Sequence, residues 1–309
     1  MIVQCFARIL IIGAFAASMA PLSIVALAAS PPAAHDDEAG EAVAASVQTD
    51  QELAASVPAA IRNRGTLIVG ALMQQQPEDF YAEDGRTPIG FEVDLASALA
   101  RALGLKVEYQ TMAFDALIPA LRSGRVDMTM SAMNDTKPRE KTISFVDYFN
   151  AGITMLARKG NPDHITGPES LCGQAVSVQA GTTQQAFAES QSAACKATGK
   201  EPVAIVISSS TEQQEESLRT GRFAVILYDT PNTIYIAQVA GNGRLFQAID
   251  YPPINGGPYG IGVAKENSAL LSVIQKAMQK LMETGVYGKI LAAWGMTAGA
   301  IPKATVNAG

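Results

Sequence analysis

Between residues 66 and 132 short apolar runs alternate with amphipathic stretches. TLIVGAL at 66–72 and VDMTMSA at 126–132 are typical of buried strands, and KVEYQTM at 106–112 alternates like a half-buried strand. Between these runs, FEVDLASALARALG and FDALIPALRSG carry apolar residues at helical spacing, and each ends at a glycine. The order β-α-β-α-β predicts a mostly parallel sheet with flanking helices.

The same rhythm restarts after residue 173. Strands are predicted at QAVSVQ, PVAIVI and RFAVILY, and helices at TTQQAFAESQSAACKAT, STEQQEESLRTG and TPNTIYIAQVA. A strand in the Gly- and Pro-rich stretch YPPINGGPYGIGVAK and two helices, SALLSVIQKAMQKLMETG and VYGKILAAWG, follow. Ligands of parallel α/β sheets bind beyond the carboxyl ends of the strands. If the two units face each other, their strand ends line one cleft.

The first 57 residues differ from this pattern. Residues 1–28 hold a single charge, Arg8, and an apolar run ending in Ala26-Leu27-Ala28, which predicts a cleaved signal peptide; a membrane anchor is the alternative. Residues 29–57 are rich in alanine and acids and poor in large apolar side chains, which predicts a tether or a disordered leader in which nascent helix can form. We therefore expect an exported protein that is cleaved near Ala28, and the family resemblance given below implies the periplasm.

Composition narrows the functional classes. The chain has 309 residues, of which 48% are hydrophobic, and its net charge of −6 without a basic stripe argues against nucleic-acid binding. His35 and His164 are the only histidines, which leaves little material for a histidine-based catalytic triad or a zinc site. No cofactor and no metal are expected.

Cys172 and Cys195 remain after removal of the signal peptide. In an oxidising compartment an even pair predicts a disulfide, which the chain-entropy model values at about 3–4 kcal/mol for a loop of this length. Two buried free thiols and a metal site are the alternatives.

Five segments in a fixed order resemble family 3 solute-binding proteins, the periplasmic polar amino-acid receptors of ABC importers. They are GFEVDLASALA (90–100), LIPALRSGRVDMTMSAMNDTKPREKTISFVDYF (117–149), VSVQAGTTQ (176–184), GRFAVILYDTPN (221–232) and VYGKILAAWG (286–295). The resemblance implies a type II periplasmic-binding-protein fold: two α/β lobes with mixed or parallel sheets, joined by two crossover strands. We expect lobe 1 at 58–152 plus 259–309 and lobe 2 at 153–258. The pairing of Cys172 with Cys195 also resembles one branch of the family.

The resemblance assigns three residues to the ends of a bound amino acid. Arg139 is expected to bind the α-carboxylate, because a guanidinium matches a carboxylate bidentately. Asp229 is expected to accept hydrogen bonds from the α-ammonium, and Thr183 to close on the carboxylate from lobe 2. The residues themselves allow other roles, namely a surface salt bridge for Arg139 and a helix cap for Asp229 or Thr183.

Further contacts follow from the same resemblance. The family uses backbone groups at the position of Ala132, a hydroxyl residue where Asn134 stands, and an aromatic wall at Phe114. An ordinary Asn-Asp turn and simple core burial are the alternatives for Asn134 and Phe114. Gln179 and Gln184 lie close to Thr183 in sequence and are plausible contacts.

The end of the site that holds the ligand's side chain departs from the family. Leu72 and Gln75 stand where an acidic or polar residue and an aromatic platform are usual. Without a carboxylate at Leu72, the sequence argues against Arg, Lys or His as ligand, although Glu78 and Asp79 are near in sequence. The glutamines would suit an amide or a small polar group.

The expected function is therefore capture and not catalysis. A monomeric binding protein would close its lobes on an amino acid and deliver it to a membrane permease of an ABC importer. Two alternatives stay open: a cyclohexadienyl-dehydratase-like enzyme on the same fold, which needs a positioned acid or base, and a component that presents its ligand to a sensor.

Overall fold

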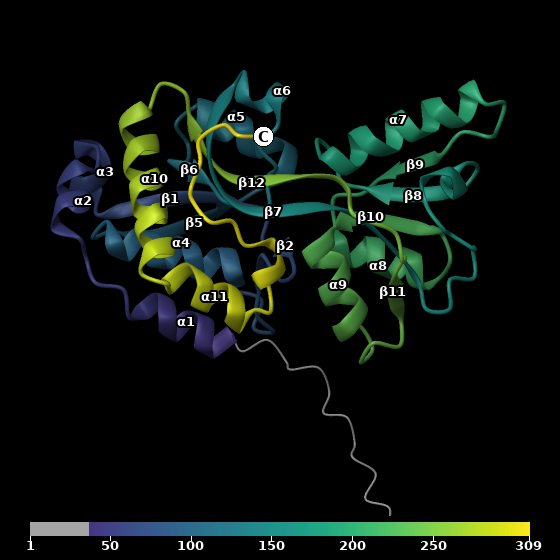
Figure 1. The fold of residues 1–309 in the computed structure, drawn as a ribbon, viewed down its shortest axis with the longest axis horizontal. Helices are drawn as coiled ribbons and strands as arrows, with labels where there is room; N and C mark the ends of the chain where they lie inside the picture. Colours follow the sequence, from purple (N-terminus) through teal and green to yellow (C-terminus); the bar gives the residue numbers. More distant parts are fainter. Residues whose placement is uncertain (1–36) are drawn as a thin grey trace, which may run out of the picture. The chain divides into compact units, whose positions relative to one another are not determined.

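The computed structural model describes residues 37–309; the predicted signal peptide and residues 29–36 of the predicted leader lie outside this range. In the first lobe, strands β5, β1 and β6 lie side by side and run parallel (Figure 1). Helix α4 buries a face of Phe91, Leu95 and Leu99 against this sheet. The elements are α3 (Ala59–Arg64), β1 (Thr66–Ala71), α4 (Phe91–Ala102), β5 (Lys106–Thr111), α5 (Leu117–Arg122), β6 (Met128–Thr129) and α6 (Lys137–Glu140).

A small antiparallel sheet interrupts the first lobe between β1 and α4. It consists of β2 (Gln74–Gln75), β3 (Asp79–Tyr81) and β4 (Pro88–Ile89). The sequence pattern did not indicate this three-stranded sheet, because its strands are too short to show periodicity.

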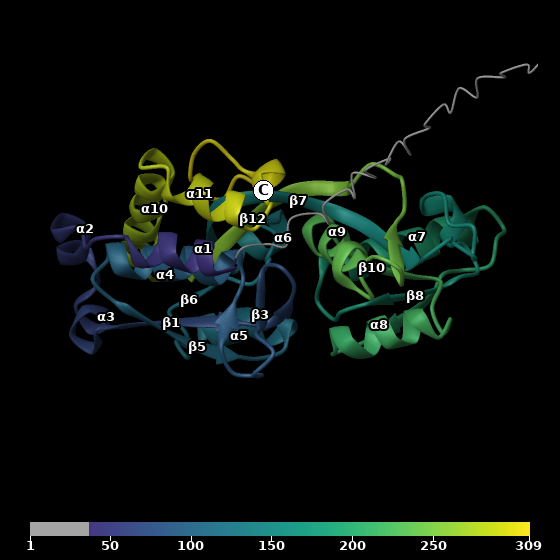
Figure 2. The same ribbon diagram turned by 90° about the horizontal axis from the view of Figure 1, so that it is seen from below.

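The second lobe repeats the parallel arrangement with β10, β8 and β9. Two views agree that β8 lies between α7 and α8 (Figures 1 and 2). The elements are β8 (Ala175–Val178), α7 (Thr183–Ala197), β9 (Ala204–Ile207), α8 (Thr211–Arg219), β10 (Val225–Asp229), α9 (Thr230–Val239) and β11 (Phe246–Ala248).

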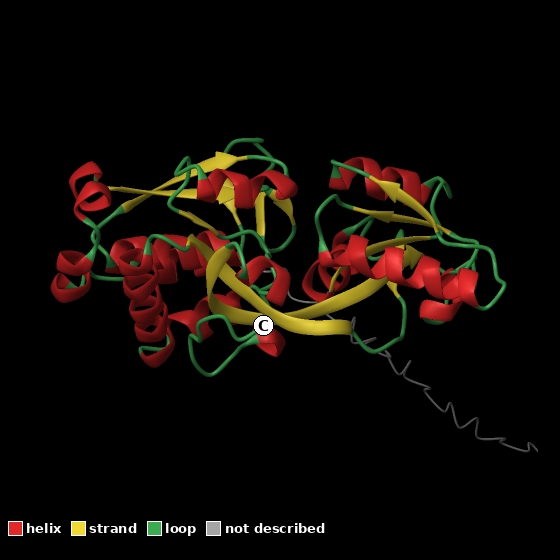
Figure 3. Cartoon of the chain, turned by 90° about the horizontal axis from the view of Figure 1, so that it is seen from above, coloured by secondary structure: helices red, strands yellow, loops and turns green. Residues whose placement is uncertain are grey.

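Two long antiparallel strands, β7 (Ile143–Arg158) and β12 (Ile254–Ala264), run between the lobes (Figure 3). They join both parallel groups into one mixed sheet of nine strands within the described residues, so the two expected sheets are continuous. Gly260 allows the strands to approach, because a Cβ there would lie 2.7 Å from the ring of Phe145. The expected lobe boundaries fall inside these strands and stay a prediction.

The C-terminal part covers the first lobe. Helices α10 (Ser268–Glu283) and α11 (Val286–Ala293) pack against α4, and the last ten residues run back along β7. This C-terminal strap, residues 300–309, is fixed where Phe145 N donates to Asn307 Oδ1 (2.8 Å) and Gly309 N donates to Asp135 Oδ2 (3.0 Å). The strap therefore supports the loop that precedes α6.

The prediction of a disordered leader is wrong for residues 37–57. This stretch forms α1 (Asp37–Ala45) and α2 (Gln51–Ser56), with Leu53 and Val57 buried and Asp50 capping α2. Its small side chains permit close packing: a Cβ at Gly40 would lie 2.7 Å from the indole nitrogen of Trp294. Close contacts of α1 with α4 and α11 stabilise this segment, although it lacks large apolar side chains, and that lack had suggested disorder.

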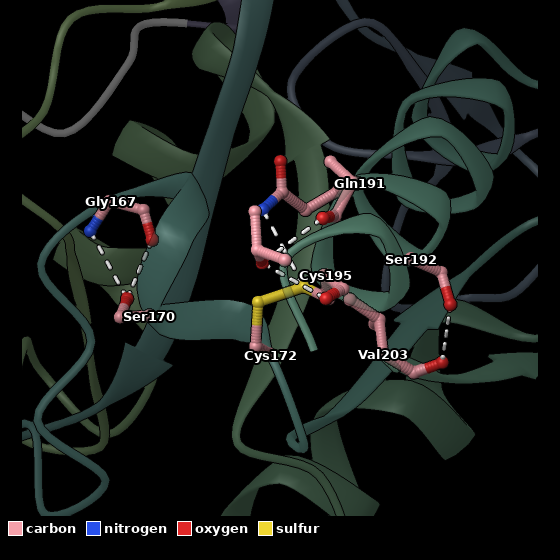
Figure 4. Close-up of a disulfide and its surroundings, with 9 residues drawn as sticks. Gly167, Ser170, Cys172, Gln191, Ser192, Cys195 and Val203 are labelled. Atoms are coloured by element: carbon pink, nitrogen blue, oxygen red, sulfur yellow. Dashed lines mark hydrogen bonds between the residues drawn. A yellow bond between two sulfur atoms is a disulfide. The ribbon is translucent and has the colours of Figure 1, made fainter. Parts of the chain in front are cut away.

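The predicted disulfide between Cys172 and Cys195 is present, with a Cα–Cα distance of 5.6 Å (Figure 4). It connects the end of a short 3-10 helix, Pro168–Leu171, to α7. Cys195 is fully buried in the core of the second lobe. Within residues 37–309 no helix has both the length and the apolar character needed to cross a membrane.

Candidate ligand-binding cleft

A cavity of about 900 Å³ lies between the lobes, at the carboxyl ends of β1, β8 and β10. The small sheet of β2, β3 and β4 forms the wall of the cavity on the first lobe. The second lobe contributes residues that follow β8, the first turns of α8, and the junction of β10 with α9. This is the edge where parallel α/β sheets place ligands.

Arg139 lies next to the cavity, outside the residues that line it, and contacts both lobes. Thr136 caps α6 and accepts a hydrogen bond from the Arg139 backbone N–H. The guanidinium donates through Nη1 to Asn134 O (2.8 Å) and through Nη2 to Gly181 O on the second lobe (2.9 Å). Its Cζ lies 5.3 Å from the centroid of the Phe114 ring. Among the described residues no ion pair joins Arg139 to a carboxylate, and Glu140 pairs with Lys137 instead, so the surface salt bridge is not formed.

The electrostatic environment keeps Arg139 charged. Burial lowers the pKa of Arg139 to about 10, and the negative charges of Asp229 and Asp135 act in the opposite direction. The group therefore remains a cation at neutral pH, and its positive charge lowers the pKa of Asp229 on the second lobe.

Two adjacent threonines on the second lobe, Thr182 and Thr183, make different hydrogen bonds. Thr182 caps α7 by accepting a hydrogen bond from Gln185 N (3.1 Å). Thr183 is therefore not the cap, and its hydroxyl donates to Asn134 Oδ1 on the first lobe (3.0 Å). Gly181 has φ +73°, which favours glycine, and its carbonyl is the one that Arg139 reaches. Arg139, Phe114, Asn134 and Thr183 thus gather in one cluster.

Asp229 is a buried carboxylate on the cavity wall. It occupies the N-cap position of α9, but its side chain makes no capping hydrogen bond. The residue is 5% exposed, and its Oδ1 has no hydrogen-bond partner within residues 37–309. Burial raises the pKa of Asp229 to about 7, against the lowering effects of Gln184, Tyr259 and the Arg139 charge. The helix-cap alternative therefore does not account for this side chain.

Three of the predicted glutamines line the same cavity: Gln75, Gln179 and Gln184. Gln75 Oε1 and Gln179 Nε2 are buried without a hydrogen-bond partner in the part of the chain that the structure describes. Gln184 Oε1 accepts from Thr183 (3.2 Å) and so links the cavity to the Arg139 cluster. Unpaired buried amides in a cavity are costly unless a polar ligand or water completes them.

Leu72 and Ala132 lie away from the cavity. Leu72 is packed in the core beside Phe114. Ala132 has φ +46°, and its N–H donates to the carboxylate of Glu92 (3.0 Å), so this backbone donor is already used inside the first lobe. The predicted residues on the cavity wall are Gln75, Gln179, Gln184 and Asp229, whereas Phe114, Asn134, Arg139 and Thr183 are not among the lining residues either.

A contact between the lobes escaped the sequence reasoning. Asn232 Nδ2 donates to Gln76 O (2.9 Å) and to Glu78 Oε2 (2.7 Å) on the first lobe. Burial raises the pKa of Glu78 well above its usual range, and the charges of Glu92 and Asp229 raise it further. Asn232 follows Asp229 by three positions in LYDTPN, and this helical spacing could have placed both on one face.

The acidic character of the cavity was also missed. The carboxyl groups on its wall are Glu83, Glu212, Glu215 and Asp229, and no Lys or Arg is among the residues that line this described cavity. Burial and the charge of Glu212 raise the pKa of Glu215 to about 7. Across residues 37–309, no three His, Cys, Asp or Glu side chains are arranged to hold a metal ion.

Two α/β lobes joined by two crossing strands, with a polar cavity between them, define a ligand-binding protein of the type II periplasmic-binding fold. Residues 67–297 match the family model of the bacterial extracellular solute-binding proteins, family 3, and the chain belongs to this family. The family resemblance and the fold class that the sequence predicted are thereby confirmed.

Several relatives of this chain are amino-acid-binding proteins. An arginine-binding protein of Corynebacterium glutamicum is 31% identical over 257 residues, which are 83% of each chain. A solved structure of an ancestral arginine-binding protein bound to arginine has a TM-score of 0.67 and 34% identity, over 75% of this chain and 98% of that one. An ancestral amino-acid-binding protein described as a precursor of cyclohexadienyl dehydratase has a TM-score of 0.67 and 31% identity, over 76% and 97%.

Proposed function

We propose that this protein captures a free amino acid between its two lobes and delivers it to the permease of an ABC importer. The observation that carries the proposal is a half-buried cation of the first lobe, Arg139, whose charge acts on a buried anion of the second lobe, Asp229. Arg139 would bind the α-carboxylate and Asp229, with its unpartnered Oδ1, would accept from the α-ammonium. Their opposite charges match the two ends of a zwitterion.

Closure follows from where these groups lie. The Arg139–Gly181 and Thr183–Asn134 hydrogen bonds join the lobes on one side of the cleft, and Asn232 joins them on the other. A ligand held by groups of both lobes would favour the state in which these contacts form, because an open state offers only one set of partners.

We propose further that the preferred ligand has a cationic side chain, with arginine as the first candidate. The expectation against Arg, Lys and His rested on Leu72, which lies in the core and does not border the cavity. Carboxylates from other segments line the wall instead, and the chain resembles proteins described as arginine-binding. A cavity with negative charge and no cation favours a cation.

Binding, and not catalysis, is the role we propose. The relatives described above are binding proteins, although one is a precursor of a dehydratase. Glu78, a buried acid that a dehydratase could use as a proton donor, is not on the cavity wall and already pairs with Asn232. Incubation with prephenate or arogenate is expected to give no product; product formation by pure protein would contradict this part.

Calorimetric titration with a panel of the twenty amino acids tests the main proposal. Arg139→Ala is expected to weaken binding of every ligand by at least about 100-fold, because it leaves a buried carboxylate unpaired at a cost of about 3–5 kcal/mol. Arg122→Ala, which removes an exposed arginine of the same lobe, is the matched control and should bind normally. Unchanged affinity in Arg139→Ala would refute the assignment.

The location and the partners belong to the same proposal. The family is one of extracellular proteins, and we propose export by a signal peptide at residues 1–28, action as a monomer, and docking to a permease. Size-exclusion chromatography with light scattering tests the monomer, and mass spectrometry of the N-terminus of exported protein tests cleavage near Ala28.

A further inference from the structure

Helix α8 presents a distinct acidic face to the cavity. Thr211, Glu212 and Glu215 all line the cavity wall, and their spacing of three and four residues places them on one side of the helix. The orientation of α8 is fixed from its other side, because Gln214 is fully buried, donates to Ser177 Oγ (2.9 Å) and accepts from Tyr228 (3.2 Å).

Glu215 has no cationic partner in the described chain. It makes no hydrogen bond or ion pair there, and the groups whose charges act on it or feel it are Glu212 and Tyr228. The cation nearest along α8, Arg219, is already held by Glu216 at 2.8 and 2.7 Å. A half-buried carboxylate next to a second carboxylate is unfavourable until a cation neutralises it.

Other unpaired groups in the same cavity point independently to a polar ligand. Asp229 Oδ1 and Gln179 Nε2 are buried without partners, in residues that are 5% and 9% exposed. A cavity of about 900 Å³ has room for a long side chain between Asp229 and α8. The amino terminus of α8 also reaches the first lobe, where Thr211 N donates to Gln74 Oε1 at 3.5 Å.

We propose that Glu215, assisted by Glu212, selects a ligand with a cationic group at the end of its side chain. The residues that determine the preferred side chain would then lie on the second lobe. The proposal rests on the proposed function and names the residue that reads the side chain. Since Arg139 lies on the first lobe and Glu215 on the second, a cationic amino acid would tie the lobes together by both of its ends.

The test compares arginine with citrulline, which has the same shape but a neutral urea group. Wild-type protein is expected to bind arginine more tightly by about 10–100-fold, the size of one charge-assisted contact in a partly buried site. Glu215→Gln should weaken arginine binding by that factor and change citrulline binding less than about threefold. Glu216→Gln, on the exposed side of the same helix, is the matched control and should leave both affinities unchanged.

Glu212→Gln is a second variant at an exposed position, so its folding is not in question. It should reduce the preference for arginine by a smaller factor, about two- to fivefold. If Glu215→Gln and Glu212→Gln both keep the wild-type ratio of arginine to citrulline affinity, the inference is overturned while amino-acid binding stands. If wild-type protein binds no amino acid, the proposed function fails as well.

Discussion

The pH dependence of ligand affinity provides a quantitative test of the cleft chemistry. Burial holds the pKa of Asp229 at about 7, so the carboxylate that would accept the ligand α-ammonium is ionised above pH 7 and protonated below it. The affinity should therefore be full at higher pH and be lost as the pH falls through 7. Between pH 5.5 and 7.5 the ionised fraction of such a group rises from about 0.03 to 0.76, which gives up to about a 25-fold gain in affinity.

Two ligands that differ in side-chain charge separate the contributions of Asp229 and Glu215 to the pH dependence of affinity. Citrulline, with a neutral side chain, depends on Asp229 alone, whereas arginine also depends on Glu215, whose pKa is held at about 7 by burial and by Glu212. If both groups must ionise, arginine affinity gains up to about 600-fold over the same range, the product of two such factors. The ratio between the two ligands should then itself rise with pH.

Calorimetry in buffers of different ionisation enthalpy counts the protons directly. At pH 7 a group with a pKa near 7 is half protonated, so binding should release about 0.5 proton with citrulline and about 1 with arginine. Glu215→Gln should reduce the arginine value to that of citrulline. Flat affinity together with no proton release at pH 6 would refute the reasoning, because it would mean that Asp229 is already ionised or does not meet the ammonium.

Three further predictions concern stability. Reduction of the disulfide should lower the free energy of unfolding by about 3–4 kcal/mol, measured by urea denaturation with and without reductant; no change would mean that the bridge does not form in solution. Gly299→Ala should destabilise by about 1–3 kcal/mol, because its Cβ would overlap the Phe149 ring. Gly288→Ala, which has open space around it in α11, should stabilise by about 1 kcal/mol. The reverse order of melting temperatures would contradict this packing. Leu53→Ala should cost about 2–3 kcal/mol because α2 packs on the core, and an effect below about 0.5 kcal/mol would show that this segment is dispensable.

The sequence could predict the lobes because their order depends on local signals. Apolar runs, helix periodicity and glycines at helix ends are short-range features, and α3, for example, ends at Gly65 in the left-handed conformation. Thr136 likewise caps α6 through a local hydrogen bond, which places Arg139 on the first helical turn. Motif order then placed both within a known family.

The composition of the cavity wall could not be predicted in the same way. Gln74 and Thr211 meet across the cleft although 137 positions separate them, and no local pattern records which face of α8 turns inward. That face depends on Gln214, a polar residue that is buried only because Ser177 and Tyr228 complete its hydrogen bonds. Residues 37–57 were misjudged for a related reason: small side chains suggest disorder unless the surface that they pack against is known.

The positions of the charged groups suggest how this cleft would distinguish ligands. Arg139 lies on the first lobe, whereas Asp229 and Glu215 lie on the second, so the charges that a ligand must satisfy are divided between the lobes. An amino acid with a neutral side chain would satisfy Arg139 and Asp229 but leave Glu215 to keep its proton. An amino acid with a cationic side chain would neutralise both Asp229 and Glu215 on the second lobe, and its α-carboxylate would bind Arg139 on the first lobe. On this proposal the side-chain charge adds to the free energy of closure, and affinity and closure should change together in Glu215→Gln. Small-angle scattering with saturating arginine tests this: the variant should need more ligand than wild type to reach the same compact state.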